Sequence, residues 1–338
     1  MAPSSCALAL SLGEPAGIGP DIALMAWHRR ESNALPAFFI TGDAACLERR
    51  AVLLGLPTPI APCAPEEAPS LFGRTLPVVS AGALATAAPG RPDATSAEAA
   101  RAAIDHAVAC VQRGVAAALV TNPIAKAVMY GGGFTFPGHT EYLAHLSGDP
   151  TLRPVMMLWS PELAVVPATI HVPLAEVPRL LTRELLVETG RITARDLARR
   201  FGVARPRLVF CGLNPHAGED GTIGREDEEV VRPAVEALCA EGTDARGPAP
   251  ADTLFHPAAR ATYDAVIGAY HDQVLGPIKT IAFESAVNVT LGLPFVRTSP
   301  DHGTAFDIAG SGRADPSSLI AALRLARRLA DADAEGAR

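Results

Sequence analysis

Three histidines stand at, or a few residues beyond, the ends of short hydrophobic runs that predict β-strands: His171, His216 and His271. Neutral imidazoles are good ligands for divalent metal ions, and three of them leave coordination positions open for a substrate. The first two histidines are 45 residues apart and the last two are 55 apart, spacings that match no local metal-binding motif. The fold would therefore have to bring them together, and three separate structural histidines remain the alternative.

A second group of residues could bind a phosphate or a carboxylate. His139 and Thr140 lie on a loop after a glycine, where an imidazole, a hydroxyl and backbone N–H groups can converge on one anion. Lys279 and Arg297 could neutralise a phosphate, and Asn288 lies near Arg297 in a run rich in β-branched residues. The alternatives are an ordinary surface turn for the first pair and a solvated edge for the two cations.

The chain has only two lysines, Lys126 and Lys279, against 27 arginines. A lysine is a compact ammonium that can change its protonation state, whereas arginine stays charged, so the lysines are candidates for roles that arginine cannot fill. Lys126 comes shortly after the predicted strand at residues 117–121, where open α/β sheets bind their ligands.

Two loops that contain glycines could hold a cofactor. Residues 11–21 follow a hydrophobic strand and lead into a helix, so Gly17 and Gly19 could let a ligand approach the helix N-terminus. The spacing is not the G-x-G-x-x-G dinucleotide fingerprint, and an ordinary strand-to-helix connection is the alternative. Residues 301–316 form a polar loop ahead of a predicted helix, and this loop resembles the nucleotide-binding loop of isocitrate and isopropylmalate dehydrogenases.

The elements that must position these residues alternate along the chain. Eight short hydrophobic runs are separated by helical patterns, which predicts an α/β protein with a substantially parallel sheet. The clearest helical patterns cover residues 97–112, 174–201, 226–241 and 317–330. The connectors at residues 57–69 and 242–250 are rich in Pro and Gly, and we expect them to be surface loops.

Composition excludes several classes of protein. The 338 residues are 49% hydrophobic and 19% charged, which predicts a packed globular chain of about two domains. A net charge of −7 argues against a nucleic-acid partner. The apolar run at residues 6–12 is too short for a signal peptide or a membrane span, so we expect a cytoplasmic protein with no membrane partner.

The cysteines show no C-x-x-C spacing, which argues against a zinc knuckle or a dithiol redox pair. We expect them to be small buried side chains in a reducing compartment. They are Cys6, Cys46, Cys63, Cys110, Cys211 and Cys239.

Taken in order, several motifs make the chain resemble the 4-hydroxythreonine-4-phosphate dehydrogenase family of vitamin B6 biosynthesis, a relative of isocitrate and isopropylmalate dehydrogenases. The resemblance covers about residues 13–329. The motifs are Gly-Glu-Pro-Ala-Gly-Ile-Gly-Pro-Asp, Pro-Gly-His-Thr-Glu, Gly-Leu-Asn-Pro-His-Ala-Gly-Glu, Pro-Ala-Asp-Thr-Leu-Phe, Tyr-His-Asp-Gln, Asn-Val-Thr-Leu-Gly-Leu-Pro-Phe-Val-Arg-Thr-Ser and Asp-His-Gly-Thr-Ala. They imply an isocitrate/isopropylmalate dehydrogenase-like two-domain α/β/α fold with mostly parallel sheets and a non-Rossmann NAD site. Residues 1–130 with 275–338 would form the cofactor-binding domain, and residues 131–274 the substrate, metal and dimerisation domain.

The resemblance also implies roles for single residues. The metal ligands would be His171, His216 and His271. The contacts to a small phosphorylated substrate would be His139, Thr140, Lys279, Asn288 and Arg297. The NAD or NADP site would include Gly17, Gly19, Asp301, His302, Gly303 and Asp307. Candidates for proton transfer are Asp272, Lys126 and Asp252. The resemblance further implies a homodimer with one divalent metal per site (zinc, magnesium or cobalt), to which the partner subunit's His171 contributes.

The function implied by the resemblance is oxidation of 4-phosphooxy-L-threonine by NAD. The β-keto acid formed would lose CO₂ to give 3-amino-2-oxopropyl phosphate for pyridoxal phosphate biosynthesis. Residues 121–129 and 276–283 depart from some relatives and leave other diols open as substrates, namely D-threonate or D-erythronate phosphate, or a carboxylated cyclohexadiene cis-diol. A zinc hydrolase and a phosphate-binding protein without catalysis are the alternatives from other classes.

Overall fold

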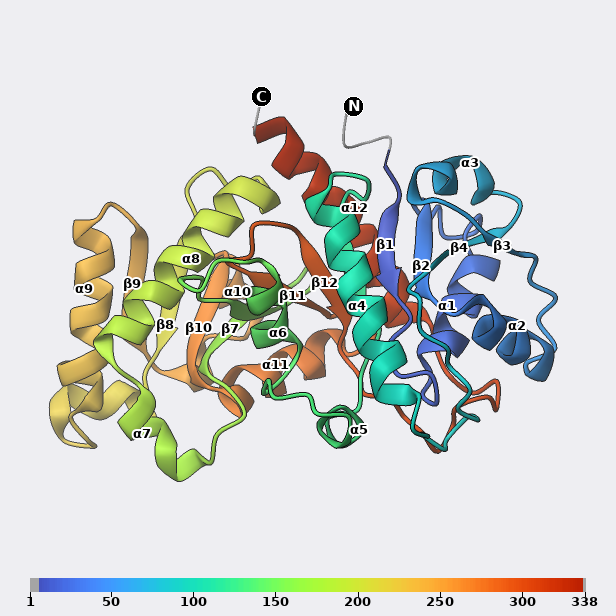
Figure 1. The fold of residues 1–338 in the computed structure, drawn as a ribbon. Helices are drawn as coiled ribbons and strands as arrows, with labels where there is room; N and C mark the ends of the chain where they lie inside the picture. Colours follow the sequence, from blue (N-terminus) through green and yellow to red (C-terminus); the bar gives the residue numbers. More distant parts are fainter. Residues whose placement is uncertain (1–5, 337–338) are drawn as a thin grey trace. The chain divides into compact units, whose positions relative to one another are not determined.

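The computed structural model describes residues 6–336, which form two compact units (Figure 1). Unit 1 contains the chain up to Leu152 and again from Leu293 onward, and unit 2 is Arg153–Gly292. Each unit has its own group of paired strands and its own helices.

In unit 1 the strand order is β3-β4-β2-β1-β5-β12, and all neighbouring strands are parallel. The strands are β1 (Leu8–Ser11), β2 (Phe38–Gly42), β3 (Ile60–Pro62), β4 (Leu76–Ser80), β5 (Leu119–Thr121) and β12 (Arg297–Pro300). The helices are α1 (Gly19–His28), α2 (Ala44–Leu53), α3 (Ala68–Leu71), α4 (Ser96–Gln112), α5 (Lys126–Gly131), α6 (His139–Leu146) and α12 (Ser317–Gly336), with a short turn η2 (Pro65–Glu67).

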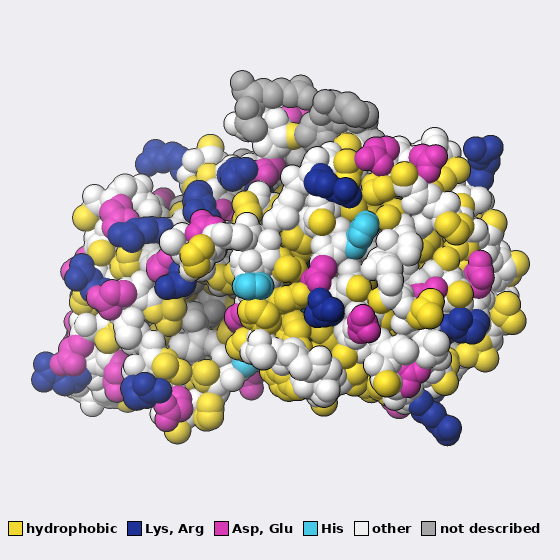
Figure 2. Space-filling model, viewed as in Figure 1, with side chains coloured by type: hydrophobic (Ala, Val, Ile, Leu, Met, Phe, Trp, Pro, Cys, Tyr) yellow, Lys and Arg dark blue, Asp and Glu magenta, His cyan; other side chains and the backbone are white. Residues whose placement is uncertain are grey.

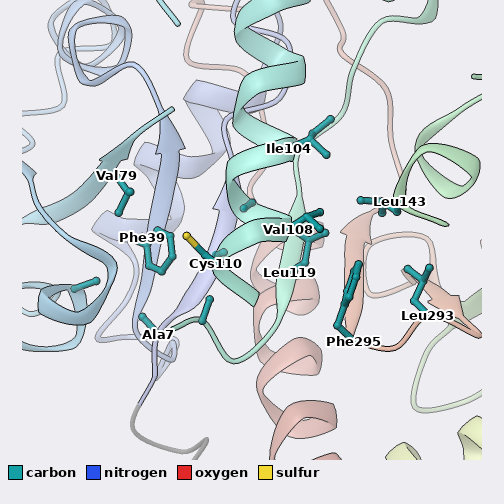
Figure 3. Packing of buried hydrophobic residues seen from close by; sticks show 14 of the residues in the cluster. Ala7, Phe39, Val79, Ile104, Val108, Cys110, Leu119, Leu143, Leu293 and Phe295 are labelled. Atoms are coloured by element: carbon teal, nitrogen blue, oxygen red, sulfur yellow. The ribbon is translucent and has the colours of Figure 1, made fainter. Parts of the chain in front are cut away.

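The central strands of unit 1 are covered by helices, which explains why their sequences are continuously hydrophobic. Every residue of β1 and β2 is buried. Helix α4 packs against both strands, and Figure 3 shows its Val108 beside Leu119 of β5 in the shared core. Burial of a large side chain such as Phe39 contributes about 1.5–3 kcal/mol to folding.

In unit 2 the strand order is β11-β6-β7-β10-β8-β9. Strand β6 is antiparallel to β11 and β7, whereas β7, β10, β8 and β9 run parallel to one another. The strands are β6 (Val155–Trp159), β7 (Ala164–Thr169), β8 (Arg207–Cys211), β9 (Asp244–Ala249), β10 (Ala265–Tyr270) and β11 (Val287–Leu291). The helices are α7 (Val177–Leu180), α8 (Arg183–Phe201), α9 (Arg232–Ala240), α10 (Pro257–Arg260) and α11 (His271–Ala282), with short segments η3 (Leu174–Glu176), η4 (Pro215–Gly221), η5 (Asp227–Val231) and η6 (Ala251–Thr253).

The middle of unit 2 places three strand ends at one edge of the sheet. Strand β10 lies between β7 and β8 and is parallel to both, so the segments that follow these strands emerge side by side. Helix α11 folds back on β10 and packs Val274 and Ile278 into the core with Val209 and Val266. Gly268 allows this close approach, because a side chain there would collide with Val274.

The predicted α/β class with mostly parallel strands is confirmed. The prediction of loops at residues 57–69 and 242–250 was wrong, because each connector carries a strand, β3 and β9 respectively. Both are edge strands, where Pro and polar residues are tolerated and the hydrophobic signal is weak. The predicted helix at residues 174–201 is interrupted before α8, whose N-cap Thr182 accepts a hydrogen bond from the Leu185 N–H (3.1 Å).

The limits of the compact units differ from the predicted domain limits at 130/131 and 274/275. Residues 131–152 belong to unit 1, because Tyr142 and Leu143 of α6 join its core (Figure 3 shows Leu143). Residues 275–292 belong to unit 2, because β11 pairs with β6 along its whole length. The roles assigned to the two domains remain predictions.

Within residues 6–336 no helix combines the length and the apolar character that a membrane span requires. On the face shown in Figure 2, the side chains of Lys and Arg lie scattered among those of Asp and Glu.

Candidate active site

The ends of β7 and β10 bring two of the predicted metal ligands together. Thr169 pairs with Tyr270, so His171 and His271 follow neighbouring strand ends in unit 2. Their ring centroids are 5.8 Å apart, and both rings line an open cavity of about 280 Å³ together with Thr169, Leu174, Tyr270 and Asp272. The backbone of His171 has a positive φ (53°), which is uncommon for a residue other than glycine.

His216 lies on η4, which follows β8, the other parallel neighbour of β10. It is exposed and does not line the cavity that contains His171 and His271. In the described part of the chain, no group of three or more His, Cys, Asp or Glu side chains is arranged to hold a metal ion. A single chain therefore brings together two of the three predicted ligands.

Two carboxylates orient the histidine rings. His271 Nδ1 lies 2.6 Å from Asp272 Oδ1, and His216 Nδ1 lies 2.7 Å from Glu219 Oε1. A carboxylate on one ring nitrogen fixes the orientation of the ring and makes the other nitrogen more basic, an arrangement common among histidines that bind metals. The donor set thus fits a divalent cation held through Nε2 atoms.

Unit 1 holds the buried part of the predicted phosphate site. Arg297, at the start of β12, is 3% exposed and donates from Nε (3.2 Å) and Nη2 (2.6 Å) to the Thr121 hydroxyl. Burial lowers the pKa of Arg297 to about 10. Burial and, secondarily, the charge of Arg297 hold the pKa of His139 well below its usual range, so this imidazole is neutral.

His139 has an unused polar atom. Its Nε2 is shielded from solvent and has no hydrogen-bond partner. The prediction that His139 and Thr140 lie on a loop was wrong, because both lie in the first turn of α6, which begins directly after Gly138. A buried polar atom without a partner is costly, which makes this nitrogen a candidate to contact a ligand oxygen. The other predicted substrate contacts, Lys279 on α11 and Asn288 on β11, belong to unit 2 and are half-buried.

The proton-transfer candidates lie in three different settings. The exposed Asp272 contacts the ring of His271 directly. Lys126 is exposed at the start of α5, and its Cε lies 3.9 Å from the position that a Cβ on Gly138 would take. Asp252 is exposed on η6, which packs against η4.

The two glycine loops of unit 1 are tied to each other. The Ile18 N–H donates to the Thr304 carbonyl (2.9 Å), and a side chain on Gly17 would meet the same carbonyl. Gly17 and Gly19 are both buried, and Gly19 packs against the Leu12 carbonyl, so the need for glycine here is accounted for by internal packing. In the second loop, His302 Nε2 is shielded without a partner, Asp301 N–H donates to Ser318, and Gly303 and Asp307 are exposed.

Sequence reasoning did not single out the buried ion pair beneath these loops. The Asp21 carboxylate pairs with the Arg50 guanidinium and also accepts from the Gly310 N–H (2.7 Å). Arg50 in turn donates to the carbonyls of Pro15 (3.0 Å) and Gly17 (2.9 Å). The pair thus joins both glycine loops, and the only sequence signal was an acidic residue in the first turn of α1.

Comparisons with known proteins agree on one family. Residues 34–326 match the family profile described as pyridoxal phosphate biosynthetic protein PdxA. A 4-hydroxythreonine-4-phosphate dehydrogenase of Xanthobacter autotrophicus is 66% identical over 330 residues, which cover 97% of this chain and 94% of that relative.

Solved structures of similar fold include a member of the same family. The crystal structure of 4-hydroxythreonine-4-phosphate dehydrogenase from Klebsiella pneumoniae matches with a TM-score of 0.86 and 35% identity, over 96% of this chain and 98% of that one. A terephthalate 1,2-cis-dihydrodiol dehydrogenase from Burkholderia xenovorans matches with a TM-score of 0.65 and 27% identity, over 96% and 98% of the two chains.

Proposed function

Because the chain belongs to the family of the pyridoxal phosphate biosynthetic protein PdxA, we propose that it is an NAD-dependent 4-hydroxythreonine-4-phosphate dehydrogenase. It would oxidise 4-phosphooxy-L-threonine to a β-keto acid that decarboxylates to 3-amino-2-oxopropyl phosphate, in the cytoplasm and for pyridoxal phosphate biosynthesis. The observation that carries this proposal is the His171–His271 pair in the cavity at the ends of β7 and β10.

The phosphate end of the substrate would be bound by His139, Thr140, Lys279, Asn288 and Arg297. The buried guanidinium of Arg297 and the neutral imidazole of His139 support this assignment. A guanidinium binds phosphate oxygens through charge-assisted hydrogen bonds, which strengthen where water is excluded. The unused Nε2 of His139 would supply a further contact.

One divalent cation would be held by His171, His216 and His271. Imidazole nitrogens suit zinc or cobalt, and magnesium would depend on additional oxygen ligands from the substrate. The cation would supply Lewis-acid chemistry, favouring ionisation of the substrate hydroxyl and stabilising negative charge during decarboxylation. The carboxylates of Asp272 and Glu219 would keep the rings of His271 and His216 oriented for binding.

The nicotinamide cofactor, NAD or NADP, would be held in unit 1 by Gly17, Gly19, Asp301, His302, Gly303 and Asp307. The hydrogen bond from Ile18 to Thr304 and the Asp21–Arg50 pair support this, because they connect both loops to each other. The proton released from the substrate hydroxyl would pass to Asp272, Lys126 or Asp252. Loss of one limb of the pH–rate profile in only one of the variants D272N, K126M and D252N would identify it.

The enzyme would act as a homodimer in which the partner subunit's His171 joins His216 and His271. The 5.8 Å ring separation within one chain makes same-chain pairing of His171 and His271 the competing arrangement. Mixing inactive His171→Ala and His271→Ala proteins under exchange distinguishes them. Shared ligation restores one intact site per hybrid dimer, whereas same-chain ligation restores none.

The test of the main proposal is NADH formation by the purified protein with 4-phosphooxy-L-threonine, measured before and after a chelator and after zinc is returned. Activity that is lost with the chelator and recovered with zinc supports the proposal. The likeness to the terephthalate dihydrodiol dehydrogenase makes a carboxylated diol the second candidate substrate, together with D-threonate and D-erythronate phosphates. Comparing kcat/KM across them decides, and hydrolysis without nucleotide would indicate a zinc hydrolase instead.

A further inference from the structure

The segment that carries His216 has a backbone conformation that its sequence disfavours. Residues 216–220 have φ values of 51°, 55°, 81°, 42° and 53°, and Gly221 continues at 87°. Only Gly218 and Gly221 in this run are glycines. Other L-residues enter the left-handed region singly, because the Cβ then approaches the carbonyl oxygen that follows it. A run of this kind persists only where neighbouring groups hold it in place.

One buried carboxylate holds the entry to this left-handed turn, residues 216–221. Asp227 is fully buried, and its Oδ1 accepts from the Leu213 N–H (2.7 Å). Its Oδ2 accepts from the backbone N–H and from Nδ2 of Asn214, both at 3.0 Å. Three donors from two consecutive residues thus converge on the side chain of Asp227, and both residues immediately precede Pro215 and His216.

The same carboxylate lies against the turn itself. A Cβ placed on Gly218 would lie 3.2 Å from Asp227 Oδ2, and one placed on Gly212 would lie 3.0 Å from Asp227 Oδ1 and 2.7 Å from the Cα of Ala217. The end of β8, the turn and Asp227 are therefore packed without room for a side chain at either glycine. Contacts on both sides leave the turn little freedom to relax to a right-handed conformation.

A second side chain fixes this segment relative to His271. Gln273 Nε2 donates to the Gly212 carbonyl at the end of β8 (2.8 Å), and its Oε1 accepts from the Ala269 N–H in β10 (2.7 Å). The segment clamped by Asp227 and the segment that presents His271 are thus joined by one amide. A displacement of residues 212–214 would therefore change the distance between His216 and His271.

We propose that Asp227 is a positioning residue for His216: by holding residues 213–214 it maintains the left-handed turn that presents the imidazole. The inference rests on the proposed role of His216 as a metal ligand. It assigns to Asp227 no contact with metal, substrate or cofactor. Groups that orient metal ligands affect metal affinity strongly, typically about 10–100-fold on mutation.

The experiment measures Co²⁺ binding to the metal-free, full-length protein by titration of its visible absorption. We expect Asp227→Asn to weaken Co²⁺ binding about 10–100-fold and to shift the absorption band. The asparagine side chain would place an N–H group where a carboxylate oxygen now accepts hydrogen bonds from N–H donors of residues 213–214. The matched control is Asp264→Asn. Asp264 also accepts from a backbone N–H of β8, that of Arg207 (2.8 Å), but at the opposite end of the strand. The control should bind Co²⁺ within about twofold of the parent, since its contacts lie away from the turn.

The outcomes separate the inference from the function on which it rests. If His216→Ala binds Co²⁺ like the parent, the proposed metal role of His216 is wrong. If His216→Ala loses binding while Asp227→Asn keeps the parent affinity and spectrum, the proposed role of Asp227 alone is wrong. An equal loss in the Asp264→Asn control would also overturn it, because general destabilisation would then explain the effect.

If Asp227→Asn fails to fold, a second pair of variants tests whether the left-handed turn is needed for Co²⁺ binding. Asp220 is exposed and lies in the turn with a φ of 53°. Valine is strongly disfavoured in this conformation and glycine is not. We therefore expect Asp220→Val to weaken Co²⁺ binding and Asp220→Gly to preserve it. Equal affinities for the two variants would show that the turn does not limit metal binding, which would overturn the inference.

Discussion

The two units present the side chains of the proposed site in opposite ways. In unit 1, Arg297 is almost fully buried, and the Nε2 of His139 is shielded from solvent. In unit 2, His171 and His271 face an open cavity, and carboxylates contact the rings of His216 and His271. Burial changes the charge state of a group, whereas hydrogen bonds and backbone conformation set its direction. In the proposed site, unit 1 would therefore set the protonation and charge of its side chains, and unit 2 would set the geometry of its side chains.

This difference in burial predicts how substitutions in the two units affect stability. Loss of the buried charge of Arg297 in unit 1 should not reduce stability, and loss of a histidine in unit 2 should leave stability almost unchanged. Burial lowers the pKa of Arg297 by opposing its charged form, and so reduces the stability of unit 1. The same burial would strengthen the proposed contact between Arg297 and an anion. In unit 2, His171 and His216 are exposed and His271 is half-buried, and none of them belongs to the hydrophobic core, so their loss should leave the fold intact.

The largest effect is expected from His271→Ala. We expect kcat/KM to fall at least about 1000-fold, because one predicted ligand and its link to Asp272 are removed. The free energy of unfolding should stay within about 0.5 kcal/mol, because His271 lines an open cavity and is only half-buried. Steady-state kinetics and urea unfolding measure both, with His256→Asn as the control, since Asn can replace the N-cap role of His256 on α10. A strongly destabilised variant would contradict the comparison.

Asp21→Ala should have the largest effect on stability. It leaves the Arg50 guanidinium buried without its carboxylate partner, which we expect to cost about 3–5 kcal/mol. The matched control, Arg101→Ala, removes a partly exposed pair with Asp105 in the same unit and should cost no more than about 1 kcal/mol. Urea unfolding of the two variants tests this, and KM for NAD should rise only in the first. Similar unfolding midpoints would argue against a buried pair that orders both loops.

Arg297→Met should separate activity from stability. We expect kcat/KM for a phosphorylated substrate to fall about 10–100-fold through KM, since a charge-assisted contact to phosphate is lost. The free energy of unfolding should not decrease, because the variant no longer buries a charge whose pKa is held near 10. Arg297→Lys should recover part of the affinity. A variant that is both inactive and unstable would show that Arg297 supports the fold instead.

The smallest effect concerns the pH dependence of stability. The folded state holds the pKa of His139 well below that of the unfolded chain, so the unfolded chain takes up the proton first as pH falls. Stability attributable to this residue is therefore present above about pH 6.5 and is lost below it. Between pH 6.5 and 5.5 the parent should lose about 1 kcal/mol more than His139→Gln, as measured by urea unfolding at each pH. Equal losses would contradict a buried neutral imidazole.

The sequence correctly predicted several strands that are buried on both faces, because such burial requires a continuous run of hydrophobic residues. Strands β1 and β10 are buried along nearly all of their length and are continuous hydrophobic runs. Strands β3 and β9 lie at sheet edges and contain Pro62 and Pro248, so their sequences resemble those of loops.

The candidate site shows the same limit. The adjacency of His171 and His271 follows from the parallel pairing of β7 with β10, which a rule about strand ends could anticipate. The left-handed turn after Asn214 could not be anticipated, because Ala217 and Glu219 give no local signal for a positive φ. Its cause is the contact with Asp227, which exists only once the chain has folded.

Few residues could replace Gln273. Its amide gives one hydrogen bond to the end of β8 and receives one from β10, so the side chain needs both a donor and an acceptor. Glutamate would offer only oxygens and repel the Gly212 carbonyl, and asparagine is one methylene too short to reach both strands. The distance between the segment that carries His216 and the segment that carries His271 therefore depends on this one side chain. A substitution of Gln273 would displace both imidazoles.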